Sequence, residues 1–68
     1  MSKYDGLWVY LKNTGKPLIM LSFEEIREIT GVEIDHSFLK FKKELPEYGY
    51  KVEKISMKNE MVIFSRIA

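Results

Sequence analysis

The order of local structural signals along the chain constrains its fold more than any single motif does. Helix signals occupy three stretches: Ser2–Asn13, Ser22–Thr30 and Asp35–Leu45. Strand signals occupy three others: Leu18–Leu21, Tyr50–Met57 and Met61–Ile67. The sequence therefore predicts the order helix, short strand, helix, helix, strand, strand within 68 residues.

The first helix is predicted by one apolar stripe. Its members recur at the i, i+3, i+4 and i+7 spacing that puts side chains on one helix face, and they are Tyr4, Leu7, Trp8 and Leu11. Ser2 is the expected N-cap. Gly15, followed by Lys16 and Pro17, is expected to end the helix in a left-handed C-cap.

The second helix is predicted by a capping box, in which the Ser22 side chain and the Glu25 carboxylate each bind the other residue's backbone amide. Gly31 is expected to end it. Asp35 is the expected cap of the third helix. Pro46 disfavours helical geometry at the preceding Leu45, so that end is either a kinked last turn or a separate turn.

The last two strands are predicted to form a hairpin. Tyr50 and Val52 alternate with polar residues, but Ile55 falls in the opposite phase. One extra residue near Glu53-Lys54, a β-bulge, would restore the register. The turn is Lys58-Asn59-Glu60, and Asn59 is its residue best suited to a positive φ.

This order predicts a single α+β domain over residues 1–68 with a winged helix-turn-helix-like layout and a C-terminal antiparallel hairpin. Its second and third helices would form the helix-turn-helix. Eleven side chains are expected in the core: Leu7, Trp8, Leu11, Phe23, Ile26, Ile29, Phe38, Phe41, Leu45, Val52 and Phe64. The alternative is another small α+β arrangement in which Leu18–Leu21 is a loop.

Several short motifs resemble a family of short uncharacterised bacterial proteins. They are Tyr4-Asp5-Gly6-Leu7-Trp8, Leu21-Ser22-Phe23-Glu24-Glu25-Ile26 with Gly31, Gly49-Tyr50-Lys51-Val52, and Val62-Ile63-Phe64 with Arg66. These motifs are structural, and the resemblance implies a winged-helix-like fold without implying an activity. Longer relatives place tryptophans in and after the third helix, where this chain has the lysine-rich stretch Phe38–Glu44.

Composition predicts a soluble protein of the cytoplasm. There is no cysteine, which fits a reducing compartment and rules out disulfides and thiolate metal sites. The N-terminus lacks the pattern of a signal peptide. No stretch approaches the roughly 20 apolar residues that span a bilayer, so no membrane partner is expected.

Few residues of the sequence support a catalytic or a metal-binding role. His36 is the only histidine, and beside Asp35 it is better explained as an exposed residue next to a helix cap than as an acid–base pair. Glu24, Glu25 and Glu28 fit the acidic first turn that a helix dipole favours. We therefore expect a non-enzymatic protein with no catalytic residue, metal, cofactor or small-molecule substrate.

The charge distribution favours nucleic acid narrowly as the partner. Residues 1–35 carry four basic and six acidic side chains, a net −2, whereas residues 36–68 carry seven basic and four acidic ones, a net +3. In a winged helix the third helix and the hairpin of this basic half would face DNA. The candidate contacts are His36, Ser37, Lys40 and Lys43 on the helix, Lys58 at the hairpin tip, and Lys51 or Lys54 against the backbone.

The alternative is a protein-interaction adaptor or inhibitor module on the same fold. Under this alternative five apolar side chains would remain partly exposed, although each taken singly is better explained as a core residue: Val9, Tyr10, Leu39, Met57 and Met61. Met and Tyr are common at interfaces, and a domain this small can complete its burial in a partner or a homodimer. On either reading the protein would be an accessory or regulatory one.

Overall fold

The computed structural model describes residues 3–67 and has the predicted order of elements. Its helices are α1 (Asp5–Thr14), α2 (Phe23–Thr30) and α3 (Ser37–Phe41), and α3 continues into a 3₁₀ helix, η1 (Lys42–Tyr48). Its strands are β1 (Leu18–Ser22), β2 (Tyr50–Ser56) and β3 (Met61–Arg66). Leu18–Leu21 is thus part of a strand, as predicted, and not of a loop.

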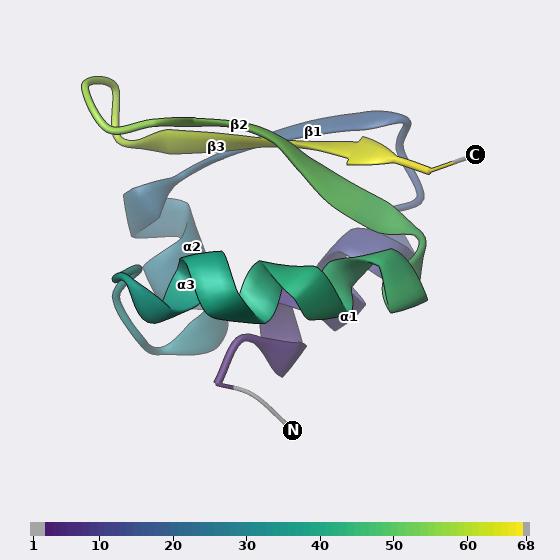
Figure 1. The fold of residues 1–68 in the computed structure, drawn as a ribbon, viewed down its shortest axis with the longest axis horizontal. Helices are drawn as coiled ribbons and strands as arrows, with labels where there is room; N and C mark the ends of the chain where they lie inside the picture. Colours follow the sequence, from purple (N-terminus) through teal and green to yellow (C-terminus); the bar gives the residue numbers. More distant parts are fainter. Residues whose placement is uncertain (1–2, 68) are drawn as a thin grey trace.

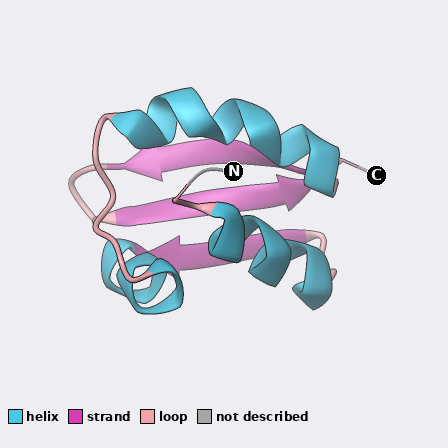
Figure 2. Ribbon diagram, turned by 90° about the horizontal axis from the view of Figure 1, so that it is seen from below, coloured by secondary structure: helices cyan, strands magenta, loops and turns pink. Residues whose placement is uncertain are grey.

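The strands form one antiparallel sheet in the order β1-β3-β2. Figure 1 shows this sheet edge-on, with every helix on one of its two sides. Figure 2 shows the helical layer in front of the sheet, where α3 and η1 run along the β2 side and α1 and α2 cover the β1 side. The opposite face of the sheet is covered by none of the described elements, so only alternate strand residues can be buried.

The ends of α1 and α2 follow local sequence chemistry. The Ser22 hydroxyl accepts a hydrogen bond from the Glu25 amide at 3.0 Å, and the Glu25 carboxylate accepts one from the Ser22 amide at 2.9 Å. This is the predicted capping box. Gly15 and Gly31 end their helices at φ of 68° and 78°, a region in which glycine carries no side-chain penalty.

The first helix begins later than predicted. Its N-cap position is Tyr4, whose carbonyl accepts the amides of Leu7 and Trp8. The predicted cap, Ser2, lies outside the described residues.

The third helix differs most from its prediction. Regular α-helix ends at Phe41, and the tighter 3₁₀ helix then carries the chain through Pro46 to Tyr48, where Gly49 stops it at φ 88°. Pro46 has no N–H to donate to the carbonyl four residues back, and its ring crowds that carbonyl. The last turns therefore leave α geometry without ending the helical path.

The hairpin contains the predicted bulge and a different turn residue. The β2–β3 register shifts between Val52 and Lys54, which confirms the extra residue at Glu53. Glu60, and not Asn59, has the positive φ, at 51°. The prediction for Asn59 was wrong because residues 57–60 form the turn and the left-handed step falls on its last member; the Asn59 amide instead donates to the Ser56 hydroxyl at 3.2 Å.

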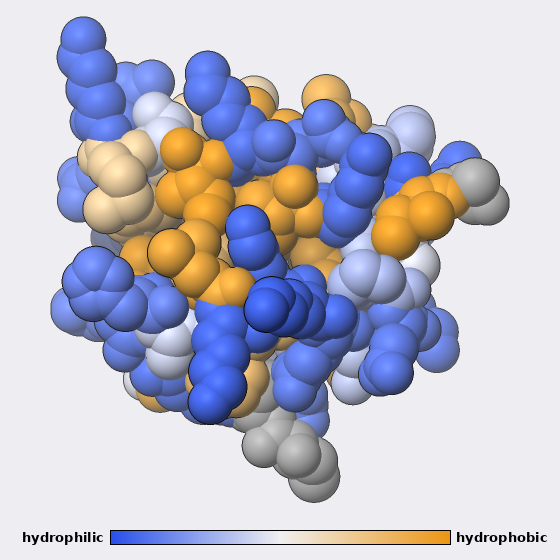
Figure 3. Space-filling view, viewed as in Figure 1, coloured by the Kyte–Doolittle hydropathy of each residue, from blue (hydrophilic) through white to orange (hydrophobic). Residues whose placement is uncertain are grey.

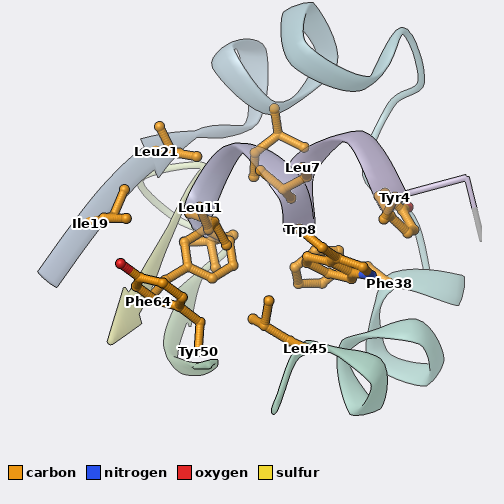
Figure 4. Packing of buried hydrophobic residues seen from close by; sticks show 12 residues of the cluster. Tyr4, Leu7, Trp8, Leu11, Ile19, Leu21, Phe38, Leu45, Tyr50 and Phe64 are labelled. Carbon is orange, nitrogen blue, oxygen red and sulfur yellow. The ribbon is translucent and has the colours of Figure 1, made fainter. Parts of the chain in front are cut away.

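The core lies between the helices and one face of the sheet (Figure 4). Seven of the expected residues are buried, and Trp8, at 0% exposed, lies in an aromatic cluster with Phe38, 5.9 Å between ring centroids. Tyr4 meets the same Phe38 ring edge-on at 5.2 Å. Four expected members are only half-buried around this core: Phe23, Ile29, Phe41 and Val52. Five buried residues were not expected: Tyr4, Ile19, Leu21, Tyr50 and Val62.

Candidate interaction surface

The predicted contact residues fall on two faces of the molecule. His36 is exposed directly before α3, Lys40 and Lys43 are exposed on α3 and η1, and Lys58 is exposed in the hairpin turn. Lys51 and Lys54 belong to β2 and point to the uncovered face of the sheet, because their cross-strand partners Ser65 and Ile63 point there too. A single partner at α3 would therefore not meet all the predicted lysines.

Lys51 is also engaged within the protein. Its ammonium lies 3.1 Å from the Glu53 carboxylate, which accepts a 2.8 Å hydrogen bond from the Ser65 hydroxyl. The Ser65 hydrogen bond, followed by the Lys51 ammonium, lowers the pKa of Glu53. Glu53 thus neutralises Lys51, whereas Lys54 on the same face forms none of the ion pairs found within residues 3–67.

The start of α3 carries a negative charge. The Asp35 carboxylate accepts hydrogen bonds from the Ser37 amide, at 2.9 Å, and from the Ser37 hydroxyl, and Lys3 lies 2.9 Å from its other oxygen. The Ser37 hydroxyl and then the Lys3 ammonium lower the pKa of Asp35 well below its ordinary range. The N-cap position of α3 is His36 and not the predicted Asp35, which lies one residue earlier and accepts from the Ser37 amide and hydroxyl. Asp35 thus occupies the groups at this helix end, including the candidate Ser37, that a phosphate would need.

The lysines of α3, η1 and the hairpin turn take no part in the ion pairs of the described residues. Among the ion pairs within residues 3–67, none includes Lys40, Lys43 or Lys58. Lys40 follows His36 by four residues and Lys43 follows Leu39 by four, so each lies one helical turn further toward η1.

An apolar hollow separates α3 from the hairpin. Its volume is about 460 Å³, and its walls come from α2, the loop after it, α3, β2 and the turn: Phe23, Ile34, Phe38, Leu39, Ile55 and Met57. Asp35 and His36 complete its rim. Figure 3 shows the hydrophobic patch on this face, extending from the left toward the centre and bordered by hydrophilic groups.

Two side chains of the apolar hollow are unusually exposed for their type. Leu39 on α3 is 49% exposed, and Met57 in the hairpin turn is 74% exposed. The sequence favours a core position for each of them, and their exposure is what the adaptor alternative requires. The other walls could not be assembled from sequence, because Phe23, Ile34 and Ile55 come from segments whose packing is set only by the tertiary fold.

A second, acidic hollow of about 580 Å³ adjoins the first and shares Phe23 and Ile34 with it. Three carboxylates and one guanidinium line it, from Glu24, Glu33, Glu60 and Arg27. Arg27 lies 3.6 Å from Glu33, so these four groups carry a net charge of about −2. Phosphate groups would be repelled from this end of the surface.

Other kinds of site find no geometric support in the described residues. Within residues 3–67, no three His, Asp or Glu side chains gather closely enough to hold a metal ion. None of the helices in that part of the chain is long and apolar enough to cross a bilayer. No family model, curated protein or solved structure matches this chain.

Proposed function

We propose that this chain is a small, non-enzymatic accessory or regulatory protein of winged-helix type. The element order, the β1-β3-β2 sheet and the position of all helices on one sheet face support this layout. In a winged helix, α3 and the β2–β3 hairpin form the usual contact surface. Fold alone does not decide the partner.

The partner that the geometry supports best is another protein, and the apolar hollow is the observation that carries this proposal. Leu39 and Met57 face solvent on opposite sides of an opening that already has Phe23, Ile34, Phe38 and Ile55 in its walls. Exposed apolar surface of this kind, rimmed by polar groups, is typical of protein-binding sites. A partner that inserts apolar side chains would gain free energy from removing both surfaces from water.

A protein partner is thus preferred over nucleic acid, which is the reverse of the order that the charge distribution of the sequence favours. A duplex lying on α3 would cover the apolar hollow without inserting apolar side chains into it, so it would not gain the free energy that such contacts provide. It would also bring phosphates toward Asp35 and toward the carboxylates of Glu24, Glu33 and Glu60.

The proposal is tested by selecting binders to the folded protein from a random peptide library displayed on phage. Selected peptides are then titrated by fluorescence anisotropy against the wild type, Leu39→Glu and Val9→Glu. Val9, on α1, is 45% exposed and lies outside the hollow, so it is a matched control for Leu39. We expect Leu39→Glu to weaken binding at least about tenfold, equivalent to about 1.4 kcal/mol, and Val9→Glu to leave it unchanged. A library without binders, or binders indifferent to Leu39→Glu, would refute the proposal.

Nucleic acid is the second candidate, favoured by the exposed ammonium groups of Lys40, Lys43 and Lys58, which form no ion pair with any residue from 3 to 67. Generic duplex and single-stranded probes, titrated by anisotropy at low and moderate salt, test it directly. A nucleic-acid binder would lose affinity steeply with salt, because neutralised phosphates release their counterions. The double substitution Lys40→Glu with Lys43→Glu should then abolish binding, whereas Lys12→Glu with Lys16→Glu, which changes net charge equally, should not. Absence of binding even at low salt would exclude this candidate.

A further inference from the structure

The sheet has two edge strands, β1 and β2, and they differ in character. In the order β1-β3-β2, β1 pairs with β3 on one side, and no strand within residues 3–67 pairs with its other side. We call that other side of β1 the open edge. The residues of β1 carry no charge, and none of them lines the apolar hollow. The open edge is therefore a surface separate from the hollow.

The register of β1 determines which of its backbone groups point to the open edge. The Arg66 amide donates to the Pro17 carbonyl at 3.0 Å, one step before the first pair of the β1–β3 register. Hydrogen-bonded and non-hydrogen-bonded pairs alternate along an antiparallel ladder, so the next residue that bonds to β3 is Ile19. Leu18 and Met20 therefore direct their N–H and C=O groups away from β3, to the open edge.

These four backbone groups of Leu18 and Met20 are not engaged elsewhere in the described part of the chain. None of the backbone hydrogen bonds outside the helices and strands of residues 3–67 includes either residue, and no side chain there bonds to their backbone. The next residue at the same edge, Ser22, differs because its amide donates to the Glu25 carboxylate at 2.9 Å. Leu18–Met20 is thus the part of the edge that can accept another strand.

The side chains of the same two residues are also exposed. Leu18 is 58% and Met20 is 54% exposed, on the sheet face that none of the described helices covers. Ile63 of β3, the cross-strand partner of Met20, lies beside them on that face. Backbone hydrogen-bonding groups and apolar side chains are thus both available at one place. An added strand would bond to the first and remove the second from water.

The other edge strand, β2, has the features that protect a sheet edge from pairing. Lys51 and Lys54 point to the uncovered face, and the bulge at Glu53 interrupts the regular spacing. Charged side chains, especially lysine, and bulges are common means by which natural sheets prevent edge pairing. β1 has no charge and no shift in register. Pro17 does not protect it either, because Pro17 faces β3 and not the open edge.

We propose that the open edge of β1 binds an extended segment of a partner protein, which becomes a fourth strand of the sheet. The backbone of this segment bonds to the N–H and C=O groups of Leu18 and Met20. Its alternate side chains are apolar and uncharged, because they lie beside Leu18, Met20 and Ile63. The inference does not rest on the proposed function, since a partner can occupy the apolar hollow without reaching this edge.

An extended segment fits the open edge better than a second copy of this chain does. Figure 2 shows α1 and α2 reaching beyond β1 at this side of the sheet. Two copies paired antiparallel through β1 would place both helical layers on the same face of one sheet, where these overhanging helices would compete for the same space. A single extended segment brings no helical layer with it.

The experiment is a selection from a phage-displayed peptide library with the full chain carrying Leu39→Glu as the bait, so that peptides that need the apolar hollow are not enriched. Enriched peptides are titrated by fluorescence anisotropy against this bait and against the bait with Met20→Pro or Met20→Thr added. Proline removes the open N–H and is tolerated in an edge strand whose N–H faces solvent, whereas threonine keeps the N–H and favours strands. We expect Met20→Pro to weaken binding at least about tenfold, and Met20→Thr to weaken it less.

Hydrogen exchange gives a second measurement, on the wild-type chain, that does not depend on the folding of a variant. In the free protein the Leu18 and Met20 amides should exchange with deuterium faster than the Ile19 and Leu21 amides, which face β3. A bound peptide should slow the Leu18 and Met20 amides selectively. Circular dichroism checks the fold of Met20→Pro, and if that variant is unfolded the exchange measurement decides.

Each outcome supports or refutes the added strand. It is refuted if the Leu39→Glu bait enriches no peptide, if the peptides bind folded Met20→Pro as tightly as the bait, or if the Leu18 and Met20 amides stay unprotected. A wild-type dimer in sedimentation that Met20→Pro converts to a monomer would assign the open edge to a second copy and refute the partner segment. The proposed function is judged by a different set of peptides, those selected with the wild type that lose affinity for Leu39→Glu, so either proposal can fail alone.

Discussion

Replacing Ser22 with alanine should destabilise the protein by about 1 kcal/mol, the typical cost of losing an N-cap hydroxyl. Ser22 is both the last residue of β1 and the N-cap of α2. The substitution removes the acceptor that now lies 3.0 Å from the Glu25 amide. Because this bond is exposed, water can replace the hydroxyl, and the cost stays well below that of a buried unpaired donor.

This free-energy change is large for so small a domain. The entropy of unfolding is about 2.1 cal/mol/K per residue, or about 0.14 kcal/mol/K over 68 residues, so about 1 kcal/mol lowers Tm by about 7 °C. Thermal unfolding followed by circular dichroism measures it, with Ser22→Thr as the control that keeps a hydroxyl. A shift below about 2 °C for Ser22→Ala, or an equal shift for Ser22→Thr, would refute the capping argument.

Three further changes test other parts of the structure. Glu60→Asn should raise stability by about 0.5 kcal/mol in urea titrations, because asparagine accepts the observed φ of 51° with less strain; unchanged or reduced stability contradicts this. Phe38→Ala removes the ring that contacts Tyr4 and Trp8 and should cost about 3–5 kcal/mol, out of a total of about 3–10 kcal/mol for 68 residues. Denaturant titration should therefore find this variant largely unfolded or close to it, and a fully stable variant would contradict the packing. Since the pKa of Asp35 is lowered in the folded state, its stabilisation is complete above the ordinary aspartate value of about 3.9 and is lost as the pH falls below it. Asp35→Asn keeps a side-chain oxygen that can accept from the Ser37 amide but removes the charge, so its Tm should fall less steeply than that of the wild type at acid pH; parallel curves would exclude this role of Asp35.

Local sequence chemistry was sufficient to predict the features that depend on a few neighbouring residues. The capping box at Ser22 and Glu25, the glycine ends at Gly15 and Gly31, and the bulge at Glu53 all follow from bonds or phases within a short window. These features set the order of elements, and the order was correct.

Features set by tertiary contacts were not predicted. All four residues of Leu18–Leu21 are apolar, so the sequence does not say which two face the helices; the pairing with β3 buries Ile19 and Leu21 and leaves Leu18 and Met20 more than half exposed. The apolar hollow was missed for the same reason. The exposure of Leu39 and Met57 followed only from the adaptor alternative, and their place in the lining of one hollow could not be predicted.

The hydrogen bond from the Phe23 amide to the Glu60 carbonyl, 2.8 Å long, joins the first turn of α2 to the hairpin turn. The tip of the hairpin therefore cannot swing away without leaving the Phe23 amide of α2 unpaired. Opening of the tip and fraying of α2 should thus be one cooperative event, in which the Phe23 amide exchanges with solvent deuterium at the rate of the hairpin amides. A partner bound in the apolar hollow, which Phe23 lines, would slow both together, so the exchange of this one amide reports occupancy of the hollow.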